Sequence, residues 1–411
     1  MKLLILSDLH VGSKARAQDF STSPDDMACR NTPDFFKDFS ELIKKESIDV
    51  THILIAGDIT QTAAYNEFEL AAKNIEAIAD LLQVGKECIY FIPGNHDSNW
   101  NDEKSSIENN EPTELTIKKK YTNLEQNKFF ANLLGNAVFQ DMYSSPYGSI
   151  WNSEEIVIVG INSSVRDGTT SDVHHGSIEP NDLNKINGEL DKLDTKNKVK
   201  VLLTHHHPKN YTDRTFQDSD FSIMQNADAF LRFATTNEFD VIVHGHKHIP
   251  RFDIHSDALN YPVVALSAGS FSASLKDYHN GVANFFHIIE VEGKCDKNDN
   301  ILGKVTTWAY FDNNKWISAN KERDYISHEE FFGDIRNRKV LKKELKHDIE
   351  TQIETTNVFR WQTLLNKKPE LKYCNLGLRE IVITELCEEE GWEYLPMRNN
   401  DFLVVQEDSS V

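Results

Sequence analysis

Leu3-Leu4-Ile5-Leu6-Ser7-Asp8-Leu9-His10 is the stretch that decides how this chain folds. Its apolar half, Leu3 to Leu6, has the length and composition of a buried strand. Its polar half places Asp8 and His10, two side chains able to bind a metal ion, directly behind that strand. The beginning of the chain therefore predicts a sheet with a site at the end of a strand.

The same succession of apolar segment and polar motif returns further along the chain. The later strand candidates Ile53 to Ala56, Ile89 to Ile92, Val199 to Leu203 and Val241 to Val243 each precede such a motif. In an open α/β sheet, ligands bind beyond the carboxyl ends of the strands, so we expect all the motifs to converge on one place. The later motifs are Gly57-Asp58, Gly94-Asn95-His96-Asp97, His205-His206-His207-Pro208 and Gly245-His246-Lys247-His248.

Helical patterns separate the first strands, which indicates an α/β core. Asp34 to Lys45 and Asn66 to Leu82 are predicted as amphipathic helices, and Ile156 to Ile161 as a further strand. The pattern changes near residue 263, where three β-rich segments follow one another with no helix between them. We expect these segments to form a second, antiparallel sheet layer: Val263 to Ser267, Phe285 to Val291 and Val305 to Phe311.

Two regions depart from this alternation. Residues 98–150 are polar, rich in Asn, Glu and Lys near their start, and are predicted to be a cap or lid insertion. The tail is helical and charged, with a predicted helix over Leu376 to Glu390, closed by Gly391, and a final hairpin over residues 392–405. The predicted organisation is a catalytic domain over residues 1–319 and a small C-terminal helical plus hairpin domain over residues 320–411.

Composition narrows the classes of partner. The 65 acidic and 44 basic side chains give a formal net charge of -21, which repels DNA, RNA and anionic lipid and favours small substrates. The only apolar stretch at the N-terminus is too short for a signal peptide or a membrane span, so a cytoplasmic location is expected. The five cysteines are scattered and odd in number, which indicates neither a disulfide framework nor a thiolate zinc site.

The motifs supply carboxylate, carboxamide and imidazole donors but no thiolate, a set that suits manganese, iron, zinc or cobalt better than calcium. Seven candidate ligands are more than one ion needs, and a carboxylate such as Asp58 can bridge two ions about 3.5–4 Å apart. We therefore predict two divalent metal ions (Mn2+, Fe2+/Fe3+ or Zn2+) with a hydroxide held between them as the nucleophile. The candidate ligands are Asp8, His10, Asp58, Asn95, His205, His246 and His248.

In this order the motifs resemble those of the calcineurin-like metallophosphoesterase superfamily, over roughly residues 1–318. The resemblance implies an α/β fold, a four-layer α/β/β/α sandwich, and a dinuclear centre bridged by Asp58. It also implies that His96 contacts the phosphate and that Asp97 orients the His96 ring. One ion would be held by Asp8, His10, Asp58 and His248, and the other by Asp58, Asn95, His205 and His246.

In two runs of identical residues it must be decided which members belong to the site. His205, His206 and His207 all follow one strand, and relatives with His-His-x-Pro bind metal through the first histidine. That likeness favours His205 and leaves His206 as a pocket or supporting residue. The run Lys118-Lys119-Lys120 could meet a phosphate, but three lysines in a row are typical of a solvated face, so we do not count them as site residues.

The motifs also favour one branch of the superfamily. Gly57-Asp58 continues with Ile59 and Thr60, and the third motif ends in Asp97, unlike the pattern of the protein serine/threonine phosphatases. The chain instead resembles the bacterial cyclic-nucleotide phosphodiesterase and glycerophosphodiesterase branch. This resemblance implies a hydrolase that attacks the phosphodiester of a small molecule, such as a cyclic nucleotide, with a metal-bridging hydroxide.

Two alternatives remain open at this point. The first is a nuclease acting on DNA or RNA, which the acidic composition disfavours. The second, of a different class, is a scaffold protein that acts through its C-terminal domain, by binding a partner or a second copy of the chain. In the helix over Leu376 to Glu390, however, the apolar face formed by Leu378, Ile381, Val382 and Leu386 is better explained by packing inside that domain.

Overall fold

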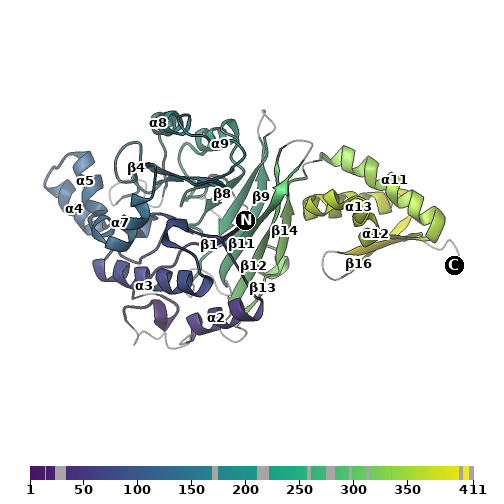
Figure 1. Ribbon diagram of the computed structural model, residues 1–411, viewed down its shortest axis with the longest axis horizontal. Coiled ribbons are helices and arrows are strands. Elements are labelled where there is room, and N and C mark those ends of the chain that lie inside the picture. The colour runs from purple at the N-terminus through teal and green to yellow at the C-terminus, as the bar shows by residue number, and fades with distance from the viewer. Residues whose placement is uncertain are drawn as a thin grey trace. The chain divides into compact units, whose positions relative to one another are not determined.

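The computed structural model describes residues 1–13, 15–23, 34–168, 175–210, 222–256, 261–274, 283–295, 299–311, 315–334, 336–397 and 401–406. The chain divides into two compact units (Figure 1). The first comprises Met1–Ile289 and Thr306–His328, and the second comprises Glu290–Val305 and Glu329–Val411. Two long strands, β11 (Asn284–Lys294) and β12 (Ile301–Phe311), therefore contribute residues to both units.

Two seven-stranded sheets organise the chain. The first has the order β13-β12-β11-β1-β2-β3, with β14 also paired to β12, and the second has the order β4-β5-β6-β7-β8-β10-β9. The other strands of the first sheet are β1 (Lys2–Leu6), β2 (His52–Ala56), β3 (Ile89–Ile92), β13 (Lys315–Ser318) and β14 (Glu329–Phe332). Those of the second are β4 (Phe139–Asp141), β5 (Gly148–Asn152), β6 (Ile156–Ile161), β7 (Val199–Leu203), β8 (Val241–His244), β9 (Pro250–His255) and β10 (Val263–Ala268).

The strands that precede the motifs form as expected, but the later strands do not. β1, β2 and β3 pair in parallel, as do β6, β7 and β8. The expectation that three late segments make a separate antiparallel sheet is wrong. β10 joins the second sheet, parallel to β8 and antiparallel to β9, whereas β11 joins the first sheet beside β1 and β12 lies next to β11. Both sheets are consequently mixed.

Side-chain alternation along the strands builds the predicted four layers. On the first sheet, Leu4 and Leu6 belong to a core cluster with α2 (Phe35–Lys45) and α3 (Tyr65–Leu82), while the second sheet packs against α8 (Pro180–Leu190) and α9 (Ala227–Thr236). Figure 1 shows α2 and α3 on one side of the first unit and α8 and α9 on the other. Between the sheets, the Tyr90 ring of β3 lies 5.7 Å from the Trp151 ring of β5. The α/β/β/α sandwich is thereby confirmed.

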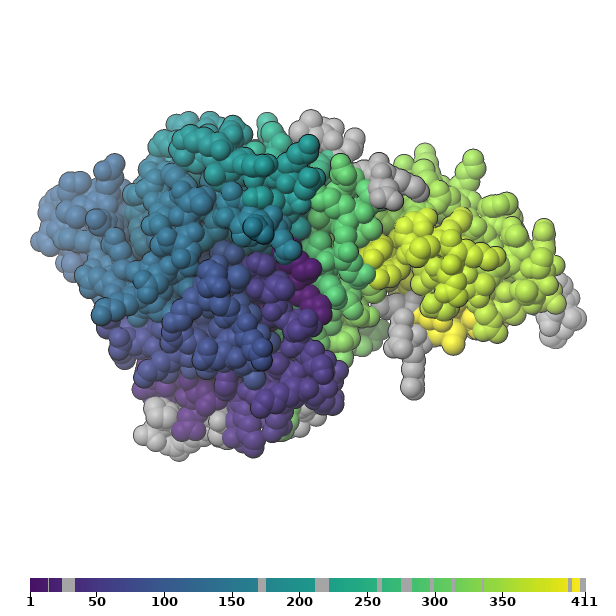
Figure 2. Space-filling model, viewed as in Figure 1, coloured from purple at the N-terminus to yellow at the C-terminus, as the bar shows by residue number. Residues whose placement is uncertain are grey.

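The insertion is folded onto this core. It contains α4 (Trp100–Glu108), α5 (Thr113–Lys120), α6 (Thr122–Gln126) and α7 (Lys128–Gly135), followed by β4. Tyr121 and Phe130 are fully buried in the cluster that also contains β1 and α3, and the Phe130 ring lies 5.8 Å from that of Phe68. Since a buried apolar side chain stabilises by about 1.5–3 kcal/mol, these residues attach the insertion firmly. It forms part of the surface beside α3 (Figure 2, blue).

The second unit has a core and a sheet of its own. In chain order its main elements are α11 (Arg338–Thr356), β15 (Val358–Arg360), α12 (Trp361–Leu365), α13 (Leu376–Glu390), β16 (Trp392–Pro396) and β17 (Phe402–Gln406). Its three strands pair antiparallel in the order β15-β17-β16. The predicted helix ending before Gly391 and the predicted hairpin are confirmed, although turn residues 398–400 lie outside the described residues.

The predicted apolar face of α13 is buried only in part. Val382 and Leu386 of α13 are fully buried in the core of the second unit, but Ile381 is 52% exposed, so its assignment to the packed face is wrong. Apart from these helices there is a short α10 (Lys321–Asp324). Within the described ranges, none of the helices has both the length and the apolar character needed to cross a bilayer.

Candidate metal centre

All five motifs lie at the carboxyl ends of strands that the fold brings together. Those of the first sheet follow β1, β2 and β3, and those of the second follow β7 and β8. Beyond the strand ends, the backbone N-H of Asp8 donates to the Gly57 carbonyl at 3.0 Å, and that of His10 donates to the Asp58 carbonyl at 2.9 Å. The first two motifs therefore remain side by side as they leave the sheet.

Four of the predicted ligands form one buried group: Asp8, His10, Asp58 and His248. The Nε2 atoms of His10 and His248 are 3.1 Å apart, and His248 Nε2 lies 3.2 Å from Asp8 Oδ1. Their candidate ligand atoms all lie within 4.8 Å of one another. Side chains separated by up to 240 residues in the sequence thus surround one small space.

A second group contains Asp58, His205 and His246, joined by the carboxamide of Asn95. Asn95 Oδ1 lies 3.1 Å from His205 Nε2 and 3.1 Å from His246 Nδ1. The two histidine nitrogens are 3.3 Å from each other. The fold has therefore brought all seven predicted ligands together, in the two sets that the family resemblance implied.

Asp58 belongs to both groups through a single oxygen atom. Asp58 Oδ2 lies 3.5 Å from His10 Nε2, in the first group, and 3.2 Å from His205 Nε2, in the second. The other oxygen, Oδ1, accepts the backbone N-H of His96 at 2.8 Å. That hydrogen bond holds the carboxylate in an orientation that leaves Oδ2 between the two groups.

The donor chemistry fits divalent cations. His205 Nδ1 donates to the Ala56 carbonyl at 2.8 Å, so in the neutral ring the lone pair of Nε2 faces the oxygens of Asp58 and Asn95. His10 Nδ1 likewise contacts Gln61 Oε1 at 3.1 Å, which directs its Nε2 towards His248. Such outward hydrogen bonds are typical of metal-binding histidines. Lone pairs that face one another at about 3 Å repel each other, and a cation bound between them turns this repulsion into coordination.

Electrostatics point the same way. Burial alone would lower the pKa of His205, but the adjacent Asp58 carboxylate outweighs burial and raises it to about 9. At His10, burial dominates and the neighbouring His96 adds to it, so the pKa falls to about 3. The Asp58 carboxylate therefore stabilises positive charge beside it, which a bound cation would supply in place of the His205 proton, and the His10 ring is in the neutral state that binds metal.

The backbone is strained at the same residues. Asp8, His10, Asp58, His246 and His248 have φ angles of 50°, 48°, 50°, 77° and 58°. A non-glycine residue in this left-handed region is uncommon and costs of order 1–3 kcal/mol, and such residues gather at functional sites. The hydroxyl of Ser270 helps to hold this backbone by donating to the Asp8 carbonyl at 2.7 Å.

Two of the motifs need a glycine because their backbone lies very close to a neighbouring side chain. A Cβ atom on Gly94 would overlap the Asp58 carboxylate, and one on Gly245 would overlap the side chains of Ser7 and Asp8. Only glycine lets these backbone segments approach the carboxylates so closely. The glycines thus shape the space into which the ligand side chains project.

His96 is placed at this centre without belonging to either group. Its ring lies 4.7 Å from that of His10, and its Nδ1 donates to the Gln61 carbonyl at 2.9 Å. The expectation that Asp97 orients this ring is wrong. The Asp97 carboxylate is instead taken up by the backbone N-H groups of Ile59, Thr60 and Gly94, at 2.8–3.0 Å, so it ties two of the motif loops to each other.

The remaining histidines of the triplet are buried outside the ligand set. His206 Nδ1 is 2.9 Å from Ser163 Oγ, and His206 Nε2 faces Asp167 Oδ2 at 3.7 Å. His207 is also fully buried, with its Nε2 3.4 Å from Ser222 Oγ. Among the three, His205 is the one that the structure brings to the ligand groups.

Sequence reasoning missed several residues that support the site. Gln61, Ser163 and Asp167 contact His10, His96 or His206, yet none belongs to a motif. Only the position of Gln61, three residues after Asp58, could have suggested it. The expectation of a solvated lysine run is wrong for Lys120, whose side chain is only 1% exposed.

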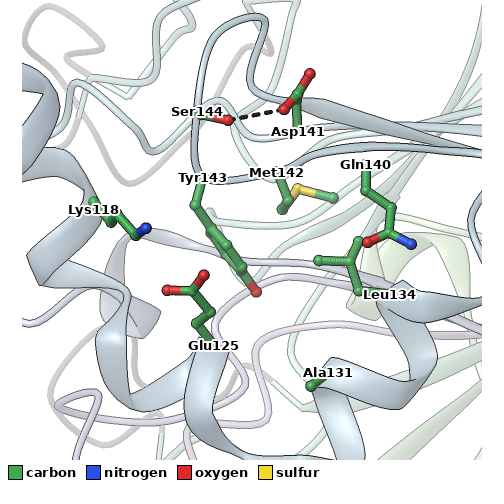
Figure 3. A pocket seen from close by; sticks show the side chains of 9 residues that line it. All are labelled: Lys118, Glu125, Ala131, Leu134, Gln140, Asp141, Met142, Tyr143 and Ser144. Carbon is green, nitrogen blue, oxygen red and sulfur yellow. Dashed lines mark hydrogen bonds between the residues drawn. The ribbon is translucent and has the colours of Figure 1, made fainter.

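A separate cavity of 290 Å³ lies in the insertion (Figure 3). Lys118 lines it, whereas the neighbouring Lys119 pairs with Glu111 at 2.5 Å. Its wall contains no residue of the two ligand groups, so it is distinct from the metal centre. The other lining residues are Glu125, Ala131, Leu134, Gln140, Asp141, Met142, Tyr143 and Ser144.

Comparison with protein families identifies the class. The sequence profile of the calcineurin-like phosphoesterase family matches residues 1–250, more than half of the chain. The chain belongs to this family. Together with the buried aspartate and histidine groups, family membership defines a metal-dependent phosphoesterase, an enzyme that hydrolyses phosphoester bonds.

Solved structures from several organisms are similar to this chain. A dimetal phosphatase from Danio rerio has 10% identity and a TM-score of 0.41, with 75% of this chain and 95% of that chain covered. The NAD nucleotidase of Haemophilus influenzae has 13% identity and a TM-score of 0.37, with coverages of 79% and 54%. Purple acid phosphatase PPD1 from yellow lupin has 12% identity and a TM-score of 0.42, with coverages of 79% and 55%. A comparison with curated proteins gave no match.

Proposed function

We propose that this enzyme hydrolyses a phosphodiester of a small molecule, such as a cyclic nucleotide, at a dinuclear metal centre. The observation that carries the proposal is the position of Asp58 Oδ2, within 3.5 Å of His10 Nε2 and 3.2 Å of His205 Nε2. One carboxylate oxygen that belongs to two groups of nitrogen and oxygen donors is what a bridged pair of ions requires.

Each proposed ion has four protein ligands. The first would be held by Asp8, His10, Asp58 and His248, and the second by Asp58, Asn95, His205 and His246. When bound, divalent ions supply such a site with charge neutralisation for the phosphate and with activation of water. Nitrogen and oxygen donors without thiolate favour Mn2+, Fe2+/Fe3+ or Zn2+ as the ions.

His96 is proposed as the residue that acts on the substrate. Because its Nδ1 donates to the Gln61 carbonyl, its Nε2 is the ring atom available to the phosphate or to the leaving oxygen. Its side chain is half-buried, whereas six of the seven proposed ligands are buried. A protonated Nε2 can donate to the oxygen that leaves as the ester bond breaks, which a diester with an alkoxide leaving group needs most.

The size of the substrate follows from charge and from the motifs. A net charge of -21 disfavours long polyanions, while two bound cations would still attract one phosphate group. Gly94-Asn95-His96-Asp97 and His205-His206-His207-Pro208 resemble the branch that acts on cyclic nucleotides and glycerophosphodiesters. Both arguments favour a small phosphodiester.

A substrate and metal matrix tests this proposal. The purified chain would be freed of metal, reloaded with Mn2+, Fe2+ or Zn2+, and given bis(4-nitrophenyl) phosphate, 4-nitrophenyl phosphate, 3′,5′-cyclic AMP or single-stranded DNA. We expect metal-dependent turnover of the diesters, with kcat/KM at least tenfold above that for the monoester, and no cleavage of DNA. Preferred cleavage of DNA would establish the nuclease alternative instead.

The second unit is relevant to the two alternatives, a nuclease and a scaffold protein. In helix-turn-helix proteins one helix lies in the DNA major groove, so the charge of α13 decides whether that helix could bind DNA in this way. Here that helix exposes Glu380, Glu388 and Glu389, which would repel the phosphate backbone. The charge of α13 therefore disfavours duplex DNA as the partner of this unit, while a scaffold role through a protein partner or self-association stays a prediction.

A further inference from the structure

Lys120, at the end of α5 in the insertion, is a buried cation with a defined set of partners. Its Nζ donates to the carbonyl of Asp167 at 2.8 Å and to that of Ser164 at 3.4 Å, and it pairs with Glu103 at 3.8 Å. Burial lowers the pKa of Lys120, while Glu103 and Asp167 oppose that change. Burying an ammonium group costs several kcal/mol of folding free energy, so an apolar residue at this position would have made the fold more stable.

The backbone that Lys120 holds carries the residues that fix His206. Ser163 Oγ accepts the backbone N-H of His206 at 3.1 Å and contacts His206 Nδ1 at 2.9 Å. Ser163 Oγ thus occupies the Nδ1 side of the ring, while Nε2 faces Asp167 Oδ2 at 3.7 Å. Neither ring nitrogen of His206 is therefore available to a metal ion. The ring is a fixed, fully buried wall.

His206 in turn packs against a proposed ligand. Its ring centroid lies 4.3 Å from that of His246. His246 is the one member of the ligand groups that is only partly buried, and its φ angle of 77° is the largest among them. It therefore depends on neighbouring side chains to keep Nδ1 directed at Asn95 and His205.

We propose that Lys120 is a positioning residue for one half of the metal centre, formed by Asp58, Asn95, His205 and His246. It acts through the 163–167 backbone and His206, which together hold the His246 ring. The other half, with Asp8, His10 and His248, has its own supports, including the contact of His10 with Gln61 and that of Ser7 with Asp8 at 2.6 Å. This inference rests on the proposed dinuclear centre, and it connects the insertion to one of the two ions.

Lys120→Met tests the inference, with Lys119→Met as its matched control. Lys119 is the adjacent residue and is 43% exposed, with a pair to Glu111 that does not involve the 163–167 segment. Changes that disturb the supports of metal ligands typically weaken metal binding by about 10–100-fold. We expect the wild-type chain and Lys119→Met to bind two Mn2+ ions, and Lys120→Met to keep one ion while binding the other at least tenfold more weakly by calorimetric titration.

Two further readouts separate positioning from general damage. In Lys120→Met, raising the Mn2+ concentration should restore most of kcat on bis(4-nitrophenyl) phosphate, since the ligands themselves are intact. Ser163→Ala removes the contact with His206 Nδ1 without changing the insertion, and should weaken the same ion, so the test stands even if Lys120→Met fails to fold. If both ions bind to a folded Lys120→Met, or to Ser163→Ala, as tightly as to the wild type, the inference is overturned. If the wild-type chain itself binds no metal, the proposed function fails first.

Discussion

At the residue scale, the centre depends most on Asp58. Its Oδ2 is shared between two groups of donors, its Oδ1 is fixed by the backbone of His96, and its own φ of 50° shows that the chain is held in an unfavourable conformation to present it. The motif letters allowed Asp58 and the other six proposed ligands to be predicted as a set. They did not allow the contacts of Gln61, Ser163 or Lys120 to be predicted, because these residues act through tertiary neighbours that no local pattern encodes.

Asp58→Asn is the sharpest residue-scale test of the shared carboxylate. The change preserves shape but removes the charge that raises the pKa of His205 and would bridge two ions. We expect the loss of at least one bound Mn2+ per chain and a fall in kcat of about 10³-fold or more, corresponding to about 4 kcal/mol. Metal content by mass spectrometry and turnover of bis(4-nitrophenyl) phosphate check this, with the exposed Asp49→Asn as the control. Two tightly held ions in Asp58→Asn would contradict the bridging role.

His96→Asn should separate chemistry from metal binding. Because His96 lies outside both ligand groups, the variant should keep two ions while kcat falls by about 10²–10⁴-fold, the range for a missing general acid. The loss should be larger for an alkyl ester than for a 4-nitrophenyl ester, since the poorer leaving group needs the proton more. Equal losses on the two esters would rule out proton donation by His96.

At the element scale, short apolar segments predicted the strands well but not their partners. β1, β2, β3, β6, β7 and β8 lie where the apolar segments placed them, since each is long enough to cross the core, and all but β6 are followed by one of the five motifs. β10, β11 and β12 have the same β-rich character, yet β10 lies between β8 and β9 in the second sheet, whereas β11 and β12 are neighbours in the first. Strand pairing depends on which sheet edge is available to a segment. That edge is a property of the tertiary fold, which the local sequence of the segment does not specify.

His287 lies in β11, and its contacts with Ala268 and Thr307 should make the stability of the fold depend on pH. It is buried between the Ala268 carbonyl, 2.7 Å from its Nε2, and Thr307 Oγ1, 2.8 Å from its Nδ1, and burial lowers its pKa to about 4. The folded state then binds fewer protons than the unfolded state between about pH 6.5 and pH 4. Stability is lost as pH falls through this window, by roughly 3 kcal/mol from this residue.

Replacing His287 by Gln keeps a donor and an acceptor but removes the titration. Urea unfolding followed by tryptophan fluorescence at pH 7 and pH 4.5 should show a smaller loss of stability in His287→Gln than in the wild-type chain, by about 2–3 kcal/mol. The Gln variant will be less stable at pH 7, so the comparison concerns the difference between the two pH values. An identical pH dependence in both chains would show that His287 is already charged in the folded state.

At the scale of the whole molecule, an acidic chain encloses a small cation-binding centre. The net charge of -21 disfavours long polyanions, and the buried donors of the two groups form the proposed place for a phosphate and two cations. Order and spacing of the motifs predicted this family and its four layers. The polar composition of the insertion did not reveal that Tyr121, Phe130 and Lys120 are buried, because only a few of its residues face inward.

The most direct measurement is anomalous X-ray diffraction from crystals of the full chain grown with Mn2+. It locates each bound ion without reference to activity. The result we predict is two peaks about 3.5–4 Å apart, with Asp58 between them, one peak beside His10 and His248 and the other beside His205 and His246. A single ion away from Asp58, or no ion among these side chains at saturating Mn2+, would contradict the assignment of the chain as a dinuclear phosphoesterase.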